Sequence, residues 1–181
     1  MMKPSYKIIN FILFQVGWLA CVLSASAGMS EIGLIYALAF IILHTSLSRR
    51  VLTEVVFIVL VTCFGFVIDS WLVFAGYFSY VNSAESMTAP MWIAALWAMF
   101  STTIGYSLNW LSSRYLLAAA LGFIFGPLAY YGASKLGAVN LPDGNMGLYF
   151  QALIWAVMLP AMFAFYNMLQ STRVLTSAEA R

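Results

Sequence analysis

The chain of 181 residues is 64% hydrophobic and only 8% charged, whereas about 25% of the residues of a typical soluble domain are charged. This excludes an ordinary water-soluble globule and makes a lipid bilayer the expected solvent. The net charge of +2 comes from scattered basic residues, so no basic patch indicates a nucleic-acid partner.

Six apolar segments, each long enough to cross the hydrocarbon core, follow one another along the chain. Only short polar breaks separate them, so consecutive segments should be antiparallel neighbours. The predicted fold is all-α: a polytopic membrane protein, a compact bundle of six transmembrane helices in which residues 1–181 form a single transmembrane domain. The helices are expected at about 8–25, 29–47, 51–78, 91–111, 114–136 and 148–170.

The first segment has a second interpretation. Lys3, Lys7, an apolar stretch and the run SASAG at 24–28 resemble a secretory signal with a small-residue cleavage site. The apolar stretch is long for a signal core, and Gln15 and Trp18 interrupt it, so a retained helix is favoured. The charge pattern does not distinguish the two, because the rest of the chain would keep its orientation.

The basic residues predict an orientation. With the N-terminus in the cytoplasm, seven of the eight Lys and Arg residues lie inside and only Lys135 lies outside, where the loops carry Glu85 and Asp143. This is the positive-inside asymmetry, and it predicts that both termini are cytoplasmic. The seven are Lys3, Lys7, Arg49, Arg50, Arg114, Arg173 and Arg181.

Many aromatic residues are expected at the membrane interfaces, where Trp and Tyr act as amphipathic anchors. The outer set is Tyr77, Tyr80, Trp92, Tyr149 and Trp155, and the inner set is Trp110, Tyr115 and Tyr166.

The fifth and sixth segments contain helix-disturbing residues. Gly122, Gly126 and Tyr130 share one helical face, which predicts close packing of a neighbouring helix or, less favoured, a ligand. Pro127 and Pro160 are expected to kink their helices.

Several stretches together resemble a family of bacterial inner-membrane proteins catalogued as domain of unknown function 2878. They are FQVGW, GFVIDSWL, APMWIAALWAMF continuing to SLNWL, and LGFIFGPLAYYGASKLGA. The resemblance covers nearly the whole chain and implies a multi-pass helical protein of the bacterial inner (cytoplasmic) membrane. It brings no established activity or site residue. Genes of such proteins often lie near those of enzymes similar to cyclopropane-fatty-acid synthases, which implies an association with membrane-lipid chemistry.

Asp69 stands out as an acid within the apolar run GFVIDSWLVF. It follows about 17 residues of helix, or about 25 Å, and so lies near the outer boundary of the membrane. Thr62, Gly65, Asp69 and Gly76 fall on one stripe, which is typical of a helix–helix contact and not of a lipid-facing surface.

Four further residues complete the candidate polar site around Asp69. Lys135, the single outer basic residue, is expected to approach the acid directly or through water, and Gln151 and Trp92 lie at a similar depth. Gln15, near the middle of the membrane, needs a hydrogen-bond partner there. Such a site, open to the outer face, would recognise a lipid headgroup or a small solute. The alternatives are a structural ion pair or an acid capped by hydroxyls such as Ser70 and Tyr77.

A second polar group lies at the inner ends of the predicted helices: His44, Glu54, Asn109 and Asn167, close to the pair Arg49–Arg50. A His and a Glu beside two Arg residues would suit a phosphate headgroup or a proton shuttle. Solvated helix caps are the favoured interpretation, since an acid at a helix start is stabilised by the helix dipole.

No metal site or cofactor is predicted. Cys21 and Cys63 fall inside apolar runs, and the single His has no second ligand nearby. The preferred function is a lipid-associated membrane protein that uses the Asp69 site, with membrane lipids and possible membrane-protein partners; whether it is an enzyme stays open. A small-solute transporter and a non-catalytic membrane scaffold are the alternatives.

Overall fold

The computed structural model describes residues 4–83, 86–142 and 145–179, with side chains for 6–83, 86–142 and 145–171. The predicted all-α class is confirmed. The helices are α1 (Pro4–Ser26), α2 (Ser30–Leu47), α3 (Val51–Phe74), α4 (Met91–Ile104), α5 (Tyr115–Lys135) and α6 (Met146–Glu179). A 3₁₀ turn η1 (Asn109–Leu111) and two short strands, β1 (Ser79–Tyr80) and β2 (Val139–Asn140), lie between them.

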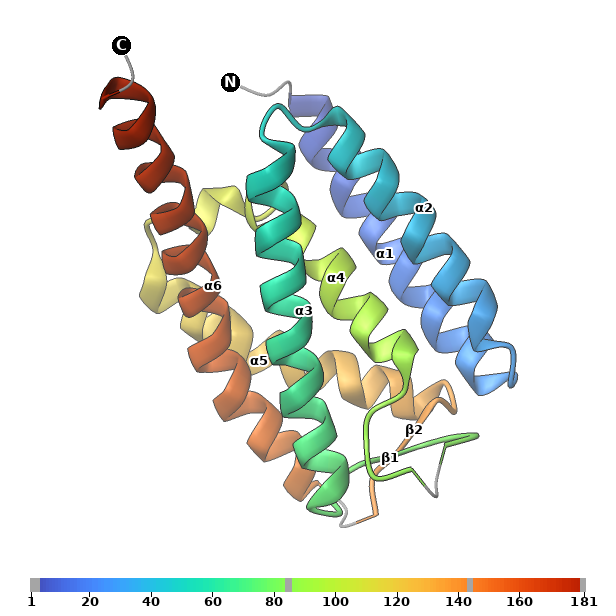
Figure 1. The fold of residues 1–181 in the computed structure, drawn as a ribbon. Helices are drawn as coiled ribbons and strands as arrows, with labels where there is room; N and C mark the ends of the chain where they lie inside the picture. Colours follow the sequence, from blue (N-terminus) through green and yellow to red (C-terminus); the bar gives the residue numbers. More distant parts are fainter. Residues whose placement is uncertain (1–3, 84–85, 143–144, 180–181) are drawn as a thin grey trace.

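Helix α4 is the centre of the bundle. It lies against α1, α2, α3 and α6, while α1 pairs with α2 and α5 pairs with α6 (Figure 1). Nine of its 14 residues are buried. The helix is about 21 Å long, shorter than the hydrocarbon core of about 30 Å.

The continuous fourth helix predicted at 91–111 is wrong in its last third, because α4 ends at Ile104. The backbone N–H groups of Tyr106 and Leu108 both donate to the Thr103 carbonyl, which closes a turn after Gly105. The hydroxyls of Ser101, Thr102 and Thr103 each donate to the carbonyl three residues earlier, at 2.6–2.7 Å. These buried hydroxyls are thus satisfied inside the helix.

The third helix also ends earlier than predicted, at Phe74 instead of 78. Gly76 has φ +80°, and the Tyr77 N–H donates to the Leu72 carbonyl. This is a glycine C-cap, in which a left-handed residue stops the helix although the sequence remains apolar. The chain then enters β1, where Tyr80 pairs with Val139 of β2. Sequence patterns did not predict these two-residue strands.

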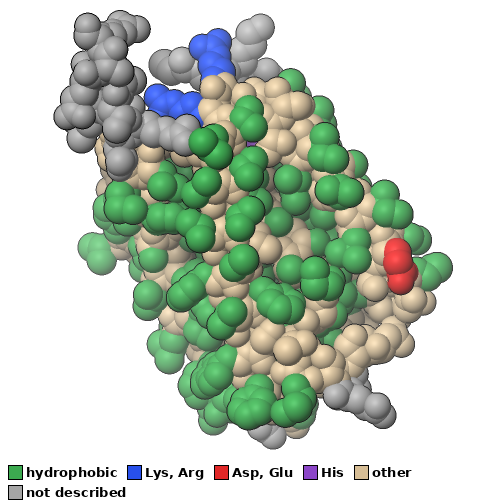
Figure 2. Space-filling view, viewed as in Figure 1, with side chains coloured by type: hydrophobic (Ala, Val, Ile, Leu, Met, Phe, Trp, Pro, Cys, Tyr) green, Lys and Arg blue, Asp and Glu red, His purple; other side chains and the backbone are tan. Residues whose placement is uncertain are grey.

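The outer surface of the bundle is apolar. Large hydrophobic side chains are exposed on every helix, but on α4 only Met91 at its start is among them. Figure 2 shows hydrophobic side chains spread over the whole of one face between the two ends, where Lys, Arg, Asp and Glu are sparse. Five helices, all except α4, are long and apolar enough to cross a membrane. These are features of a membrane protein.

The two ends of the bundle differ in charge. Helix α1 begins and α6 ends at the same end (Figure 1), and the α2–α3 turn with Arg49 and Arg50 lies there too. We call this the basic end. Figure 2 shows Lys and Arg side chains at this end and an acidic side chain toward the other.

Candidate functional site

Asp69 is completely buried. Its carboxylate accepts hydrogen bonds from side chains of three other helices. Trp97 Nε1 of α4 donates to Oδ2 at 2.6 Å. Tyr130 Oη of α5 lies 2.7 Å from Oδ1 and 2.9 Å from Oδ2. Gln151 Nε2 of α6 donates to Oδ1 at 3.1 Å. Asp69, Trp97, Tyr130 and Gln151, here called the Asp69 cluster, join α3, α4, α5 and α6.

Stacked aromatic rings hold this cluster in place. Trp97 stacks on Trp155 of α6 with centroids 4.8 Å apart and planes 4° apart. A Cβ at Gly65 of α3 would overlap the Trp97 ring, and a Cβ at Gly126 of α5 would overlap Trp155. The two glycines therefore leave room for the pair of rings, and the predicted packing role of Gly126 is borne out by this contact.

The structure brings two of the predicted site residues together, Asp69 and Gln151, and places Trp92 nearby. Trp92 is buried and meets Tyr80 edge to face at 5.4 Å. Tyr80 in turn is close enough to Asp69 for an electrostatic interaction. Burial, and then the nearby carboxylate, raise the pKa of Tyr80 well above its ordinary value, so Tyr80 stays a neutral phenol.

Lys135 and Gln15 do not join the cluster. Lys135 is exposed, and its Nζ lies over the Tyr131 ring, 5.0 Å from the centroid. Within the described side chains the only salt bridge joins His44 and Glu54. The predicted direct ion pair with Asp69 is therefore wrong, because neutral donors already surround the carboxylate. Gln15 of α1 is exposed on the surface of the bundle. The prediction that its side chain is buried with a hydrogen-bond partner is therefore wrong as well.

Trp97 and Tyr130 are the donors that the sequence interpretation missed as partners of Asp69. A signal was present in both. Tyr130 shares a face with Gly122 and Gly126, and Trp97 is one of the two indole donors in the apolar run MWIAALWAMF, five residues after Trp92. The interfacial role predicted for Tyr80, Trp92 and Tyr166 is likewise wrong, since these three are at most 8% exposed.

A second buried polar cluster lies at the basic end. His44 of α2 is 1% exposed and Glu54 of α3 is 2% exposed. His44 Nε2 lies 3.5 Å from Glu54 Oε2, and Tyr166 Oη of α6 donates to Glu54 Oε1 at 2.6 Å. We call these three residues the His44 cluster. The prediction of solvated helix caps is wrong here, because a buried acid and a buried His satisfy each other.

Aromatic rings and a hydroxyl network enclose His44. Tyr106 meets the His44 ring edge to face at 4.4 Å and lies beside Glu54. Asn10 of α1 donates to Thr102 at 3.2 Å and accepts from Ser107 at 2.8 Å. These contacts tie the start of α1 to the end of α4.

The other residues of the predicted inner group have separate roles. Asn167 donates to the Ser112 carbonyl at 3.1 Å, and Arg50 donates to Gln170 of α6. Neither lies in the His44 cluster.

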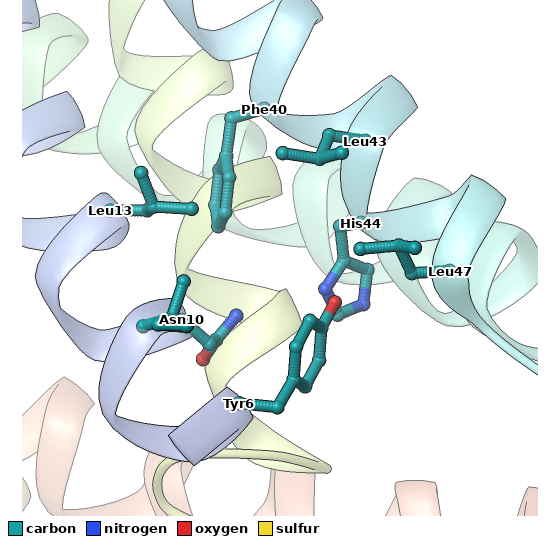
Figure 3. A pocket seen from close by; sticks show the side chains of 8 residues that line it. Tyr6, Asn10, Leu13, Phe40, Leu43, His44 and Leu47 are labelled. Atoms are coloured by element: carbon teal, nitrogen blue, oxygen red, sulfur yellow. The ribbon is translucent and has the colours of Figure 1, made fainter.

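A pocket opens beside His44, between the start of α1 and the end of α2. Its volume is about 50 Å³. Figure 3 shows Tyr6 and Asn10 of α1 on one side and Phe40 and His44 of α2 on the other. The remaining lining is aliphatic: Ile9, Leu13, Leu43 and Leu47.

Metal ligation has little support in the described residues, where no group of three or more His, Cys, Asp or Glu side chains comes together. Cys21 is buried and Cys63 exposed, and both are free thiols. The polar chemistry present at Asp69, Glu54 and His44 is hydrogen bonding.

Residues 7–161 match the sequence pattern of one protein family. The chain belongs to the family described as Protein of unknown function (DUF2878). The matched part includes the whole Asp69 cluster together with His44 and Glu54, whereas Tyr166 lies beyond it. No curated protein and no solved structure matches the chain.

Proposed function

We propose that this member of the DUF2878 family is a lipid-associated membrane protein that binds the polar end of an amphiphile in the pocket beside His44. One observation carries the proposal: the pocket has a buried polar base, His44 and Asn10, and a rim of side chains that face outward. Ile9, Leu43 and Leu47 of that rim are 48–57% exposed on the apolar surface. An amphiphile needs this combination, since its head must be hydrogen-bonded while its chain stays in hydrocarbon.

The proposal moves the lipid-binding site from Asp69 to the basic end. Asp69 has no exposed surface, and its three donors already satisfy it. We assign the Asp69 cluster the role of holding four helices together. The bilayer we propose is the bacterial inner membrane, with six spans and the basic end in the cytoplasm, as the positive-inside rule favours.

A transporter is less well supported. The two buried acids of α3 are 15 residues apart, or about 22 Å along the helix. Between them the buried face of α3 consists of Phe57, Ile58, Val61 and Gly65. Thr62 supplies the one hydroxyl of α3 between the acids, and its Oγ1 is buried. A solute or proton would therefore find a single polar side chain on α3 where a continuous path needs several.

Photo-crosslinking tests the proposal. The purified protein is placed in nanodiscs of phosphatidylethanolamine and phosphatidylglycerol that contain a trace of diazirine-labelled monoacylglycerol. We expect labelling of Ile9, Leu43 and Leu47 that is removed by excess unlabelled monoacylglycerol. The proposal would be refuted if the labelling of each residue simply increased with its exposure to lipid. It would then be strongest at Leu116, which is 90% exposed, and competitor would not remove it.

A matched pair of variants sharpens this test. Ile9 lines the pocket, whereas Ile12 is similarly exposed on α1, at 52%, and does not line it. Ile9→Trp should fill the pocket and abolish the competable labelling, and Ile12→Trp should leave it unchanged. Equal behaviour of the two variants would show that the pocket is not the binding site.

A further inference from the structure

We infer that the amphiphile bound at this pocket carries a neutral hydroxyl head, which donates a hydrogen bond to Nδ1 of His44. This inference rests on the proposed function and names the ligand class for the same site. It starts from an unpartnered atom: His44 Nδ1 is buried and has no hydrogen-bond partner within the described part of the chain. An unpaired buried polar atom destabilises the protein, so a ligand that supplies the missing hydrogen bond is bound more tightly.

The partner of the other ring nitrogen decides which role Nδ1 has. Nε2 faces Glu54 Oε2, and Glu54 Oε1 already accepts from Tyr166. A carboxylate only accepts hydrogen bonds, so the shared proton belongs to Nε2 of the imidazole. In a neutral imidazole Nδ1 then presents a lone pair, and its complement in a ligand is an O–H or N–H group.

The surroundings of the pocket favour a neutral group over an ionic one. The lining contains no Lys or Arg side chain, so a phosphate would enter without a counter-charge and would face an acceptor nitrogen. A cationic head would find no carboxylate in the lining, where only His44, Asn10 and Tyr6 carry polar side-chain atoms. Asn10 is already bonded to Thr102 and Ser107. A hydroxyl needs one acceptor and no charge.

The size of the pocket agrees with a small head. A water-sized group needs about 10–15 Å³ of such volume, and the cavity holds about 50 Å³. A hydroxyl and its adjoining carbons fit, whereas the chain would lie outside over Ile9, Leu43 and Leu47, which are already exposed to the apolar surroundings. Monoacylglycerols and long-chain alcohols have this form.

The chain contains a single His, so ¹⁵N-histidine labelling reports on His44 without assignment. In nanodiscs, 1-monooleoylglycerol should shift the Nδ1 resonance, whereas its dimethyl ether, which lacks donors, should not. The affinity advantage of the alcohol should be roughly threefold to tenfold, the effect of one net hydrogen bond. Two outcomes would overturn the inference and leave the proposed function intact. In the first, the ¹⁵N spectrum shows that Nδ1 is protonated in the free protein. In the second, the Nδ1 resonance does not move although crosslinking shows saturable binding. Absence of saturable binding by either lipid would refute the proposed function itself.

Two substitutions separate the ring nitrogens. The amide of Asn reaches the position of Nδ1, and that of Gln reaches the position of Nε2. His44→Asn should therefore keep the preference for the alcohol over the ether, and His44→Gln should lose it while retaining the contact with Glu54. Loss of the preference in both variants, with melting temperatures close to wild type, would overturn the role of Nδ1. If a variant melts far below wild type, its binding data are left out. The ¹⁵N measurement on the wild-type protein then decides by itself whether Nδ1 accepts the hydrogen bond.

Discussion

At the scale of single residues, the two buried acids of α3 are stabilised by neutral donors. Asp69 is held by an indole, a phenol and an amide, and Glu54 by a phenol and an imidazole. A carboxylate that accepts several hydrogen bonds does not need a cationic partner to be buried. This explains why Lys135 is free to lie over Tyr131 at the exposed end of α5.

Asp69→Asn should destabilise the fold. The amide has one acceptor oxygen for three donors, and its own NH₂ group would face a donor. We expect a loss of about 1–3 kcal/mol, the cost of leaving buried polar groups unpaired, seen as a lower melting temperature in detergent. Glu31→Gln, at an exposed acid of α2, is the control and should change stability by less than about 0.5 kcal/mol. A wild-type melting temperature for Asp69→Asn would contradict the structural role.

At the scale of elements, small residues determine which helices can approach. Gly122 of α5 lies against the backbone carbonyl of Trp155, and Gly126 lies against the ring of the same residue. This contact brings α5 and α6 together and positions Trp155 for its stack with Trp97. Both α5 and α6 are continuous helices through Pro127 and Pro160.

Substitutions of three glycines on α5 should separate packing from helix propensity. Gly122→Ala and Gly126→Ala place a Cβ inside Trp155, and we expect each to cost about 1–3 kcal/mol. The effect should be larger at Gly122, because a backbone atom cannot rotate away. Gly132→Ala, where the nearest atom of Trp18 is 3.4 Å away, should be neutral or slightly stabilising. Thermal unfolding of the three purified variants gives the order, and equal melting temperatures would refute it.

At the scale of the whole molecule, the protein has two polar clusters near opposite ends of an apolar bundle. Helix α1 begins and α6 ends at the basic end (Figure 1), so a membrane perpendicular to the bundle places both on one side. The pocket beside His44 lies at this same end, formed by the start of α1 and the end of α2.

Reporter fusions test this arrangement. A green fluorescent protein fused after residue 181 should fluoresce, and alkaline phosphatase at that position should be inactive, because the positive-inside rule places the basic end in the cytoplasm. Phosphatase inserted in the α3–α4 connection, after Asn82, should be active. An active phosphatase at the C-terminus would contradict the predicted cytoplasmic location of that terminus.

The sequence by itself determined the solvent, the class of fold and the approximate position of most helices, because long apolar runs have few stable forms in lipid other than helices. It also predicted that Asp69 faces other helices, which is confirmed, and that Gln151 lies at a similar depth, where the structure joins the two by a hydrogen bond. The expected opening of this site to the outer face is wrong, because Asp69 has no exposed surface. Only the tertiary structure decided the rotation of each helix, the central place of α4 and the exposure of Gln15. The physical reason is that lipid and protein core are similarly apolar, so a helix that is hydrophobic on all sides does not reveal which side is buried. For the same reason, the sequence indicated His44 and Glu54 as a candidate polar group but favoured solvated caps, and only packing decided that the two are buried against each other.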